Sequence, residues 1–112
     1  MGFKTLLVFS LILISGFSHA GKQTGTITEI IVRQSDGLHY FHMSGTASNR
    51  PACADGHAYW MIRDENSTAG KSQLSLLLAA YMSGKKVIVN GSNKCMRWGD
   101  GEDVDSVHLK GD

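Results

Sequence analysis

The chain has 112 residues, of which 42% are hydrophobic and 19% are charged, and it contains 13 Gly, one Pro and two Cys. That length and balance describe one small globular domain and exclude a large enzyme, a multidomain protein and a disordered chain. Eleven Lys and Arg stand against ten Asp and Glu, and removing the first twenty residues takes away only Lys4. A domain without net charge has no broad electropositive field, so nucleic acid is not an expected partner.

The first twenty residues have the pattern of a secretory signal peptide. Lys4 precedes an apolar run over residues 6–14, and Ser18 and Ala20 put small side chains just before a cleavage point. The run is shorter than the roughly 20 apolar residues that span a bilayer, and no later run is long enough, so no membrane span is expected. We therefore expect cleavage after Ala20 and a single mature domain over residues 21–112, secreted or periplasmic.

Export changes the interpretation of the two cysteines. Cys53 and Cys95 are the only thiols, and an isolated pair in an oxidising compartment is most simply one disulfide. Closing a loop of that size stabilises a domain by about 3 to 4 kcal/mol in the chain-entropy model. A redox-active thiol and a metal-ligand pair are the alternatives, and neither has a CxxC motif in its favour.

Most of the chain has strand patterns. Alternating or β-branched runs, separated by turn residues, predict six strands over residues 26–32, 38–44, 58–62, 86–90, 94–98 and 104–109.

One segment, residues 69–82, has a helical period instead. Asn66, Ser67 and Thr68 are N-cap candidates, and Gly84 is placed to end the helix. At about 100° per residue, one stripe is expected to pack on the sheet and comprises Leu74, Leu77, Leu78, Tyr81 and Met82. The opposite side is a candidate self-association face for a homo-oligomer and comprises Ser72, Leu76, Ala79, Ala80 and Ser83. A single exposed leucine on an ordinary helix is the alternative.

Three strands, a helix and further strands fit a small, mainly β domain with one helix, an OB-like antiparallel barrel of five to six strands. An α+β sandwich is the alternative.

The same order resembles a known family. The Tyr40-Phe41 strand, the Ala52-Cys53 pair, the Trp60 strand and a helix running into Tyr-Met-Ser-Gly-Lys-Lys-Val-Ile-Val at residues 81–89 are similar to the OB-fold B subunits of pertussis-like and subtilase-type AB5 toxins. The resemblance covers residues 27–95. It implies secretion, pentamers with helices around a central pore, and binding of host glycans.

Metal and catalytic motifs give little support for an enzyme. Asp100, Glu102, Asp103 and Asp105 could offer oxygen ligands to Ca²⁺, but their spacing is not that of an EF-hand, and a solvated acidic turn is favoured. No zinc-protease or nucleophile-elbow motif occurs. We therefore predict no enzyme, no cofactor and no metal site; a small hydrolase using His57 is the weakest alternative.

Aromatic residues are the better functional signal. Adjacent pairs in a strand point to opposite faces, so Tyr40-Phe41 and Tyr59-Trp60 each place one ring outside the core. Outward rings bordered by polar groups suit a glycan or a protein ligand, although loops or the helix could also cover them. The predicted ligand-binding residues are Tyr40, Tyr59, Trp60, Arg97, Trp98 and Asp100. The expected protein is thus a secreted binding module for a glycan or a protein; an inhibitor or envelope accessory protein is the alternative.

Overall fold

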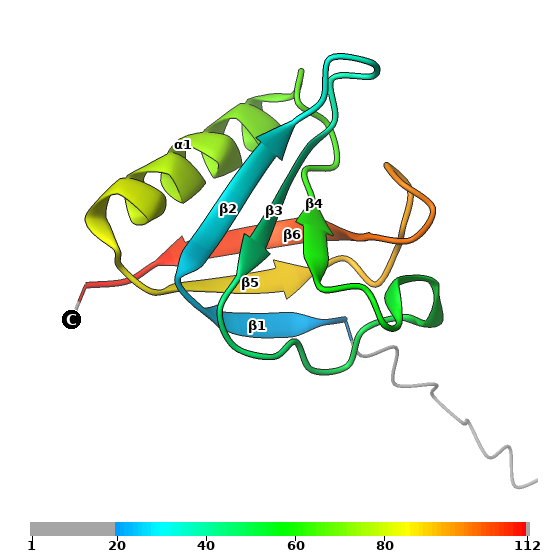
Figure 1. The fold of residues 1–112 in the computed structure, drawn as a ribbon, viewed down its shortest axis with the longest axis horizontal. Coiled ribbons are helices and arrows are strands. Elements are labelled where there is room, and N and C mark those ends of the chain that lie inside the picture. Colours follow the sequence, from blue (N-terminus) through cyan, green and yellow to red (C-terminus); the bar gives the residue numbers. More distant parts are fainter. Residues whose placement is uncertain (1–19, 112) are drawn as a thin grey trace, which may run out of the picture.

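The computed structural model describes residues 20–111, so the expected signal peptide, apart from Ala20, lies outside the described residues. They form a mainly β domain with one α-helix (Figure 1). In chain order the elements are β1 (Lys22–Gly25), β2 (Ile27–Val32), β3 (His39–Met43), a 3₁₀ turn η1 (Ala52–Ala54), β4 (Tyr59–Met61), α1 (Thr68–Ser83), β5 (Val87–Gly91) and β6 (Glu102–Leu109). The predicted helix and five of the six predicted strands are present; β1 was not predicted, and the segment 94–98 is not a strand.

All six strands belong to one sheet, in the order β1-β5-β6-β4-β3-β2. Four of the five pairings are antiparallel, but β4 and β6 run parallel, with Trp60 opposite Glu102. The prediction of an antiparallel sheet was therefore wrong at this one pair. The reason is the helix, because a crossover through α1 and β5 brings β6 back beside β4 in the same direction.

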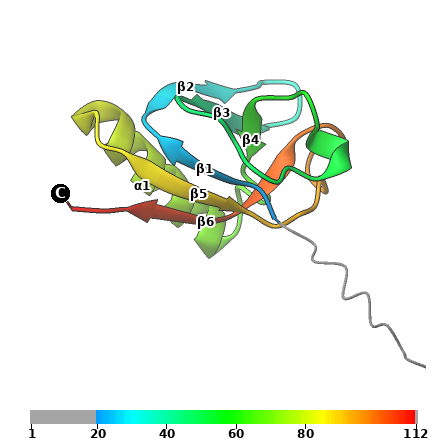
Figure 2. The same cartoon turned by 90° about the horizontal axis from the view of Figure 1, so that it is seen from below.

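The two strands at the ends of this order, β1 and β2, are consecutive in the chain and separated only by Thr26. The sheet is strongly bent, so that β2, β3 and β4 form one half and β1, β5 and β6 the other (Figure 2). At the bend Thr26 and Ser44 exchange hydrogen bonds: the Thr26 N–H donates to Ser44 Oγ at 2.8 Å and the Ser44 N–H to the Thr26 carbonyl at 2.9 Å. Described strands do not close into a complete hydrogen-bonded barrel.

The first strand escaped sequence analysis because its buried side chain is polar. Gln23 in β1 is buried, and its amide donates to the carbonyls of Ser44 and Gly45 at 3.1 and 3.2 Å. Its Oε1 accepts from the Trp60 indole N–H at 2.8 Å. A buried amide is tolerated when its hydrogen bonds are satisfied, and a hydrophobic pattern does not reveal such a residue.

The strand predicted at 94–98 is instead a loop. The Asp103 N–H donates to the Lys94 carbonyl at 2.8 Å, and the Asp103 carboxylate accepts from the N–H groups of Met96 and Arg97 at 2.9 and 3.1 Å. Backbone groups that would have joined a ladder are therefore bonded to one residue, Asp103, through its N–H and its carboxylate. Beyond the loop β6 begins at Glu102, two residues before the predicted strand at 104–109.

Local rules located the helix ends correctly. Ser67 is the N-cap, and its hydroxyl accepts from the Gly70 N–H at 2.9 Å. Gly84 ends the helix with φ +67°, in the left-handed region that favours glycine.

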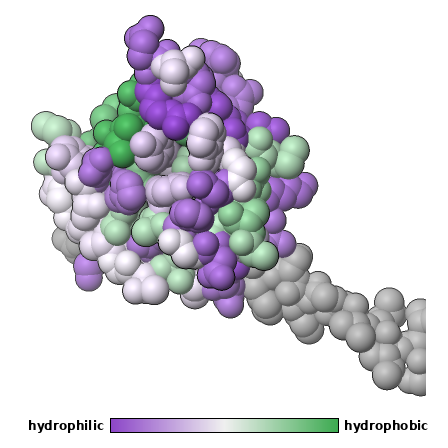
Figure 3. Space-filling view, turned by 45° about the vertical axis from the view of Figure 1, so that its right-hand side comes forward, coloured by the Kyte–Doolittle hydropathy of each residue, from purple (hydrophilic) through white to green (hydrophobic). Residues whose placement is uncertain are grey.

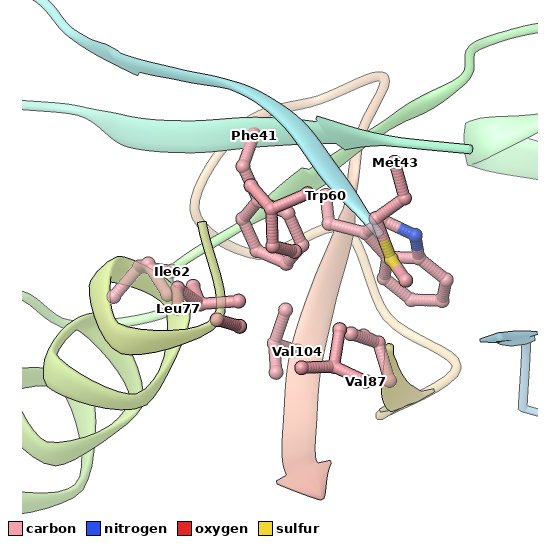
Figure 4. Packing of buried hydrophobic residues seen from close by; sticks show 10 residues of the cluster. Phe41, Met43, Trp60, Ile62, Leu77, Val87 and Val104 are labelled. Carbon is pink, nitrogen blue, oxygen red and sulfur yellow. The ribbon is translucent and has the colours of Figure 1, made fainter. Parts of the chain in front are cut away.

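The face on which the helix packs differs from the prediction. Leu77 and Ala80 are fully buried, whereas Leu78, Tyr81 and Met82 are exposed. Leu77 points from α1 toward Ile62, and Phe41, Trp60, Val87 and Val104 complete the surrounding core (Figure 4). The predicted stripe was right at Leu77, and Leu74 is half-buried, but it was wrong at Leu78, Tyr81 and Met82. The small Ala80 packs into the core beside Leu77, so the flank that carries the other large residues faces outward.

Leu77 therefore supplies the main helical contact with the core. We expect Leu77→Ala to lower the free energy of unfolding by about 2 to 5 kcal/mol, the range for a buried leucine that leaves a cavity. Leu78→Ala is the matched control: its side chain is 48% exposed against 0% for Leu77, and we expect a loss of about 1 kcal/mol or less. Urea unfolding of both variants measures the difference, and equal losses would contradict this packing.

Candidate functional site

Three of the predicted aromatic residues meet in one shallow pocket of about 230 Å³. The rings are those of Tyr40, Tyr59 and Trp98, and Asp100 and Arg33 also line it. Its volume is below the roughly 300–1,000 Å³ of sites that enclose drug-sized ligands. It is therefore large enough for one ring of a ligand rather than a whole oligosaccharide. We call this site the aromatic pocket.

Two of these rings are held in place by the pairing of β3 with β4. In this register Tyr40 lies opposite Met61 and His42 opposite Tyr59. Alternation along each strand sends Tyr40 and Tyr59 to the outer face and Phe41 and Trp60 into the core, so one ring of each pair lies outside the core, as the sequence predicted without saying which. The Tyr40 and Tyr59 rings lie edge to face, with centroids 5.8 Å apart.

Trp98 comes from the loop between β5 and β6 and is 39% exposed. The guanidinium of Arg33 lies over its ring, 4.3 Å from the centroid. Arg33 in turn pairs with Asp36, its Nε donating to Oδ1 at 3.2 Å. The hydrogen bond with Arg33 lowers the pKa of Asp36 to about 2, so this carboxylate remains charged in all but strong acid. The turn after β2 thus positions a cation against the Trp98 ring.

Several contacts hold the Trp98 loop against the sheet. Besides the Asp103 carboxylate, the disulfide Cys53–Cys95, with 6.3 Å between its Cα atoms, joins the loop to η1. The predicted disulfide is confirmed, and it is compatible with a location outside the cytoplasm. Arg97 donates to Glu65 at 3.2 and 3.3 Å and to the Asp36 carbonyl at 3.0 Å. The loop that carries Trp98 is therefore held by three contacts: the Asp103 carboxylate, the disulfide and the Arg97 side chain.

Glu65 receives those contacts as a carboxylate. Burial opposes its ionisation, but the His39 N–H, at 2.9 Å, and the Arg97 guanidinium hold its pKa below the ordinary value. Arg97 therefore lies in a different hollow, of about 570 Å³, with Glu65 and His39. In this position Arg97 fixes the loop rather than lining the aromatic pocket.

Tyr59 has the most perturbed acid–base group of the pocket. Desolvation raises the pKa of its hydroxyl to about 12, and the neighbouring Asp100 carboxylate adds to the rise. Asp100 also lies 3.9 Å from His57 Nε2, a loose and solvent-exposed pair. The phenol is therefore a neutral hydrogen-bond donor over the whole physiological range.

The structure thus divides the six predicted ligand-binding residues. Tyr40, Tyr59, Trp98 and Asp100 come together, and Arg97 is directed elsewhere. Trp60 is fully buried, so its assignment as a ligand contact was wrong: its ring fills the core while its indole N–H binds Gln23.

One pocket residue was missed by sequence analysis. Arg33 follows β2 at the start of a turn, and its role depends on a ring 65 positions later in the chain. The only local signal was the Arg33-to-Asp36 spacing across a turn with Gly37, which positions a salt bridge but does not point to Trp98.

The acidic segment does not form a solvated turn. Glu102 and Asp103 are buried in β6 and accept hydrogen bonds from backbone N–H groups. Across residues 20–111 no group of three or more His, Cys, Asp and Glu side chains is arranged to hold a metal ion.

The predicted self-association face is only partly exposed. Ala80 is buried and was wrongly included, since it packs into the core. The other four members are exposed, namely Ser72, Leu76, Ala79 and Ser83. Larger apolar side chains also reach the surface of α1, with Leu78, Tyr81 and Met82 between 48% and 82% exposed. We call Leu78, Tyr81 and Met82, which lie on one side of α1, the outer helix face.

Comparison with known proteins adds no family to this description. No model of a protein family matches the chain, and a search of curated proteins found no match. Among the described helices, none is both long enough and apolar enough to cross a membrane.

The raised pKa of Tyr59 can be tested by titration. Because folding favours the neutral phenol, its contribution to stability is complete below about pH 10 and is lost as the pH rises through about 12. The phenolate absorbance that Tyr59→Phe removes is expected to appear near pH 12. Asp100→Asn should lower this pKa, whereas Asp55→Asn, a matched change at an exposed carboxylate, should leave it unchanged. Ionisation of Tyr59 near pH 10 in the parent chain would contradict the assignment.

Proposed function

We propose that this protein is a secreted, non-enzymatic binding module that recognises a glycan through the aromatic pocket. The observation that carries the proposal is the convergence of Tyr40, Tyr59 and Trp98 around one small hollow, with Arg33 and Asp100 at its edge. Flat rings stack against the apolar face of a sugar, and charged groups beside them bind its hydroxyls. A protein ligand would call for a larger and flatter apolar area than this pocket offers.

Polar groups that line the pocket support a polar ligand. One face of the molecule carries hydrophilic areas interspersed with separate hydrophobic ones (Figure 3). The Tyr59 hydroxyl keeps its proton at neutral pH and can donate a hydrogen bond, and the Asp100 carboxylate can accept one. Both groups line the pocket. Such pairing suits the vicinal hydroxyls of a pyranose.

We further propose that the fold is an OB-like, partly open barrel, with β1 and β2 acting as two halves of one bent strand. Support comes from the sheet order, in which the two end strands are joined through Thr26. When β1 and β2 are counted as one strand, the helix also lies between the third and fourth strands. Together with the disulfide, this arrangement favours the resemblance to AB5 toxin B subunits. Export of the domain is part of the same proposal.

Self-association is the second part of the proposal, and the outer helix face is the observation that favours it. Leu78 and Tyr81 are about half exposed and Met82 is 82% exposed, on one helix of a small domain. Apolar side chains grouped in this way are typical of an interface rather than of a solvated helix. A second copy of the chain is the occupant that the toxin-subunit resemblance predicts.

The glycan proposal can be tested on an array of eukaryotic cell-surface oligosaccharides. We expect the parent chain to bind a subset, and Trp98→Ala to weaken that binding by about tenfold or more, as for a central aromatic contact. Met96→Ala is the matched control, because Met96 lies in the same loop, is 64% exposed and does not line the aromatic pocket. Undiminished binding by Trp98→Ala would reject the pocket. A tight one-to-one complex with a secreted enzyme, without glycan binding, would instead favour an inhibitor.

The oligomer is tested by light scattering of the purified, oxidised protein. We expect a mass of several chains, reduced to that of one chain by Leu78→Asp with Met82→Asp. Ala52→Asp places the same kind of charge on the exposed surface of η1, away from α1 (Figure 1), and should leave the mass unchanged. A monomeric parent chain would contradict this part of the proposal.

A further inference from the structure

The carboxylate of Glu102 is buried at the N-terminal end of the domain. Its side chain has no exposed surface, and Oε2 accepts from the N–H groups of Gly21 and Asn93, each at 3.0 Å. Its other oxygen, Oε1, is buried without a hydrogen-bond partner among the described residues. An unsatisfied oxygen on a buried acid is costly, so this position calls for a further donor.

Two glycines enclose this carboxylate. A Cβ at Gly21 would lie 2.2 Å from Glu102 Oε1, and one at Gly91 would lie 1.9 Å from Oε2, so a side chain at either position would displace the carboxylate. The Gly21 carbonyl accepts from the Gly91 N–H at 2.8 Å, which fixes residue 21 against β5. The nitrogen of Gly21 is thereby held against the acid by backbone contacts alone.

No side-chain cation forms an ion pair with Glu102 within the described part of the chain. Arg50 interacts with Glu102 through its charge but does not contact it. Its guanidinium lies over the Trp60 ring, 4.3 Å from the centroid, and donates to the Tyr59 carbonyl at 3.0 Å. Burial lowers the pKa of Arg50, and Glu102 opposes that shift only in part. The acid therefore lacks a direct counter-ion in the uncleaved chain.

We propose that cleavage after Ala20 supplies this counter-ion, as the new α-ammonium group of Gly21 forms a buried ion pair with Glu102. The proposal rests on the cleavage site expected from the sequence. The exporting cell's signal peptidase adds water across the Ala20–Gly21 peptide bond, which leaves a carboxylate on Ala20 and an amine on Gly21 that takes up a proton at neutral pH. An amide nitrogen offers one N–H, whereas an ammonium offers three, which is enough to reach Oε1 as well as Oε2.

The mature domain is consequently more stable than its precursor. The sign of the pH dependence follows from the ion pair, which favours the protonated amine in the folded state. Its stabilisation is complete below about pH 8, where a free α-amino group in an unfolded chain is protonated, and is lost as the pH rises further. Glu102, Arg50 and the Asn93 N–H are the groups around this amine, and Arg50 is held away from it by Trp60.

Four exported proteins test the pairing. The full 112-residue chain is secreted, and intact mass is expected to place the mature N-terminus at Gly21; any other start overturns the proposal. A second chain carries Thr-Gln inserted after Ala20, so that residue 21 keeps a neutral amide while cleavage still follows Ala20. Both are made with Glu102 and with Glu102→Gln, and unfolding by urea is measured at pH 7.

With Glu102, we expect the insertion to raise the unfolding equilibrium constant on the order of a hundredfold, as when one partner of a buried ion pair is removed. With Glu102→Gln, the insertion should have little effect. An equal effect in both backgrounds overturns the proposal. Should Glu102→Gln fail to fold, the pH dependence decides: the chain that begins at Gly21 loses stability between about pH 8 and pH 10 and the extended chain does not, while parallel curves overturn the pairing.

Discussion

The carboxylate of Asp103 links the sheet to the surface that we assign to binding. It lies at the start of β6, in the parallel pairing with β4, and it accepts from the backbone of the loop that carries Trp98. Arg63 reaches the same carboxylate from outside, with Nε 3.6 Å from Oδ2. One buried acid therefore determines both where β6 begins and where the neighbouring loop leaves the sheet. Without it, the loop would lose the anchor closest to its aromatic residue.

The aromatic pocket is a product of strand register and loop anchoring together. Tyr40 and Tyr59 are presented by two paired strands, so their separation is set by the sheet. Trp98 and Asp100 are presented by a loop, which gains its rigidity from Asp103, Arg97 and the disulfide. In such a surface the sheet fixes the positions of its side chains, while the loop tolerates changes in sequence.

Sequence rules located those features that depend on near neighbours. Alternation showed that each adjacent aromatic pair has one ring outside the core, capping chemistry found Ser67 and Gly84, and the compartment argument paired Cys53 with Cys95. What sequence reasoning missed depends on tertiary contacts. Gln23 is buried because Trp60 and two carbonyls satisfy its amide, and Ala80 is buried because the helix turns its small side to the core. Neither fact has a local pattern, and the position of Arg33 over Trp98 has none either.

The sequence distance between the partners of β1 has a consequence for the order of folding. β1 opens the domain, yet it pairs with β5, and the Gly21 N–H bonds to an acid 81 positions further along the chain. Contacts of such long range form late, because the loop between them must close first. During synthesis the N-terminal strand meets the segment around Ser48 early, but its main partner β5 follows only after the helix has been made. The sheet is therefore complete only after β5 and β6, the last two strands, have been made.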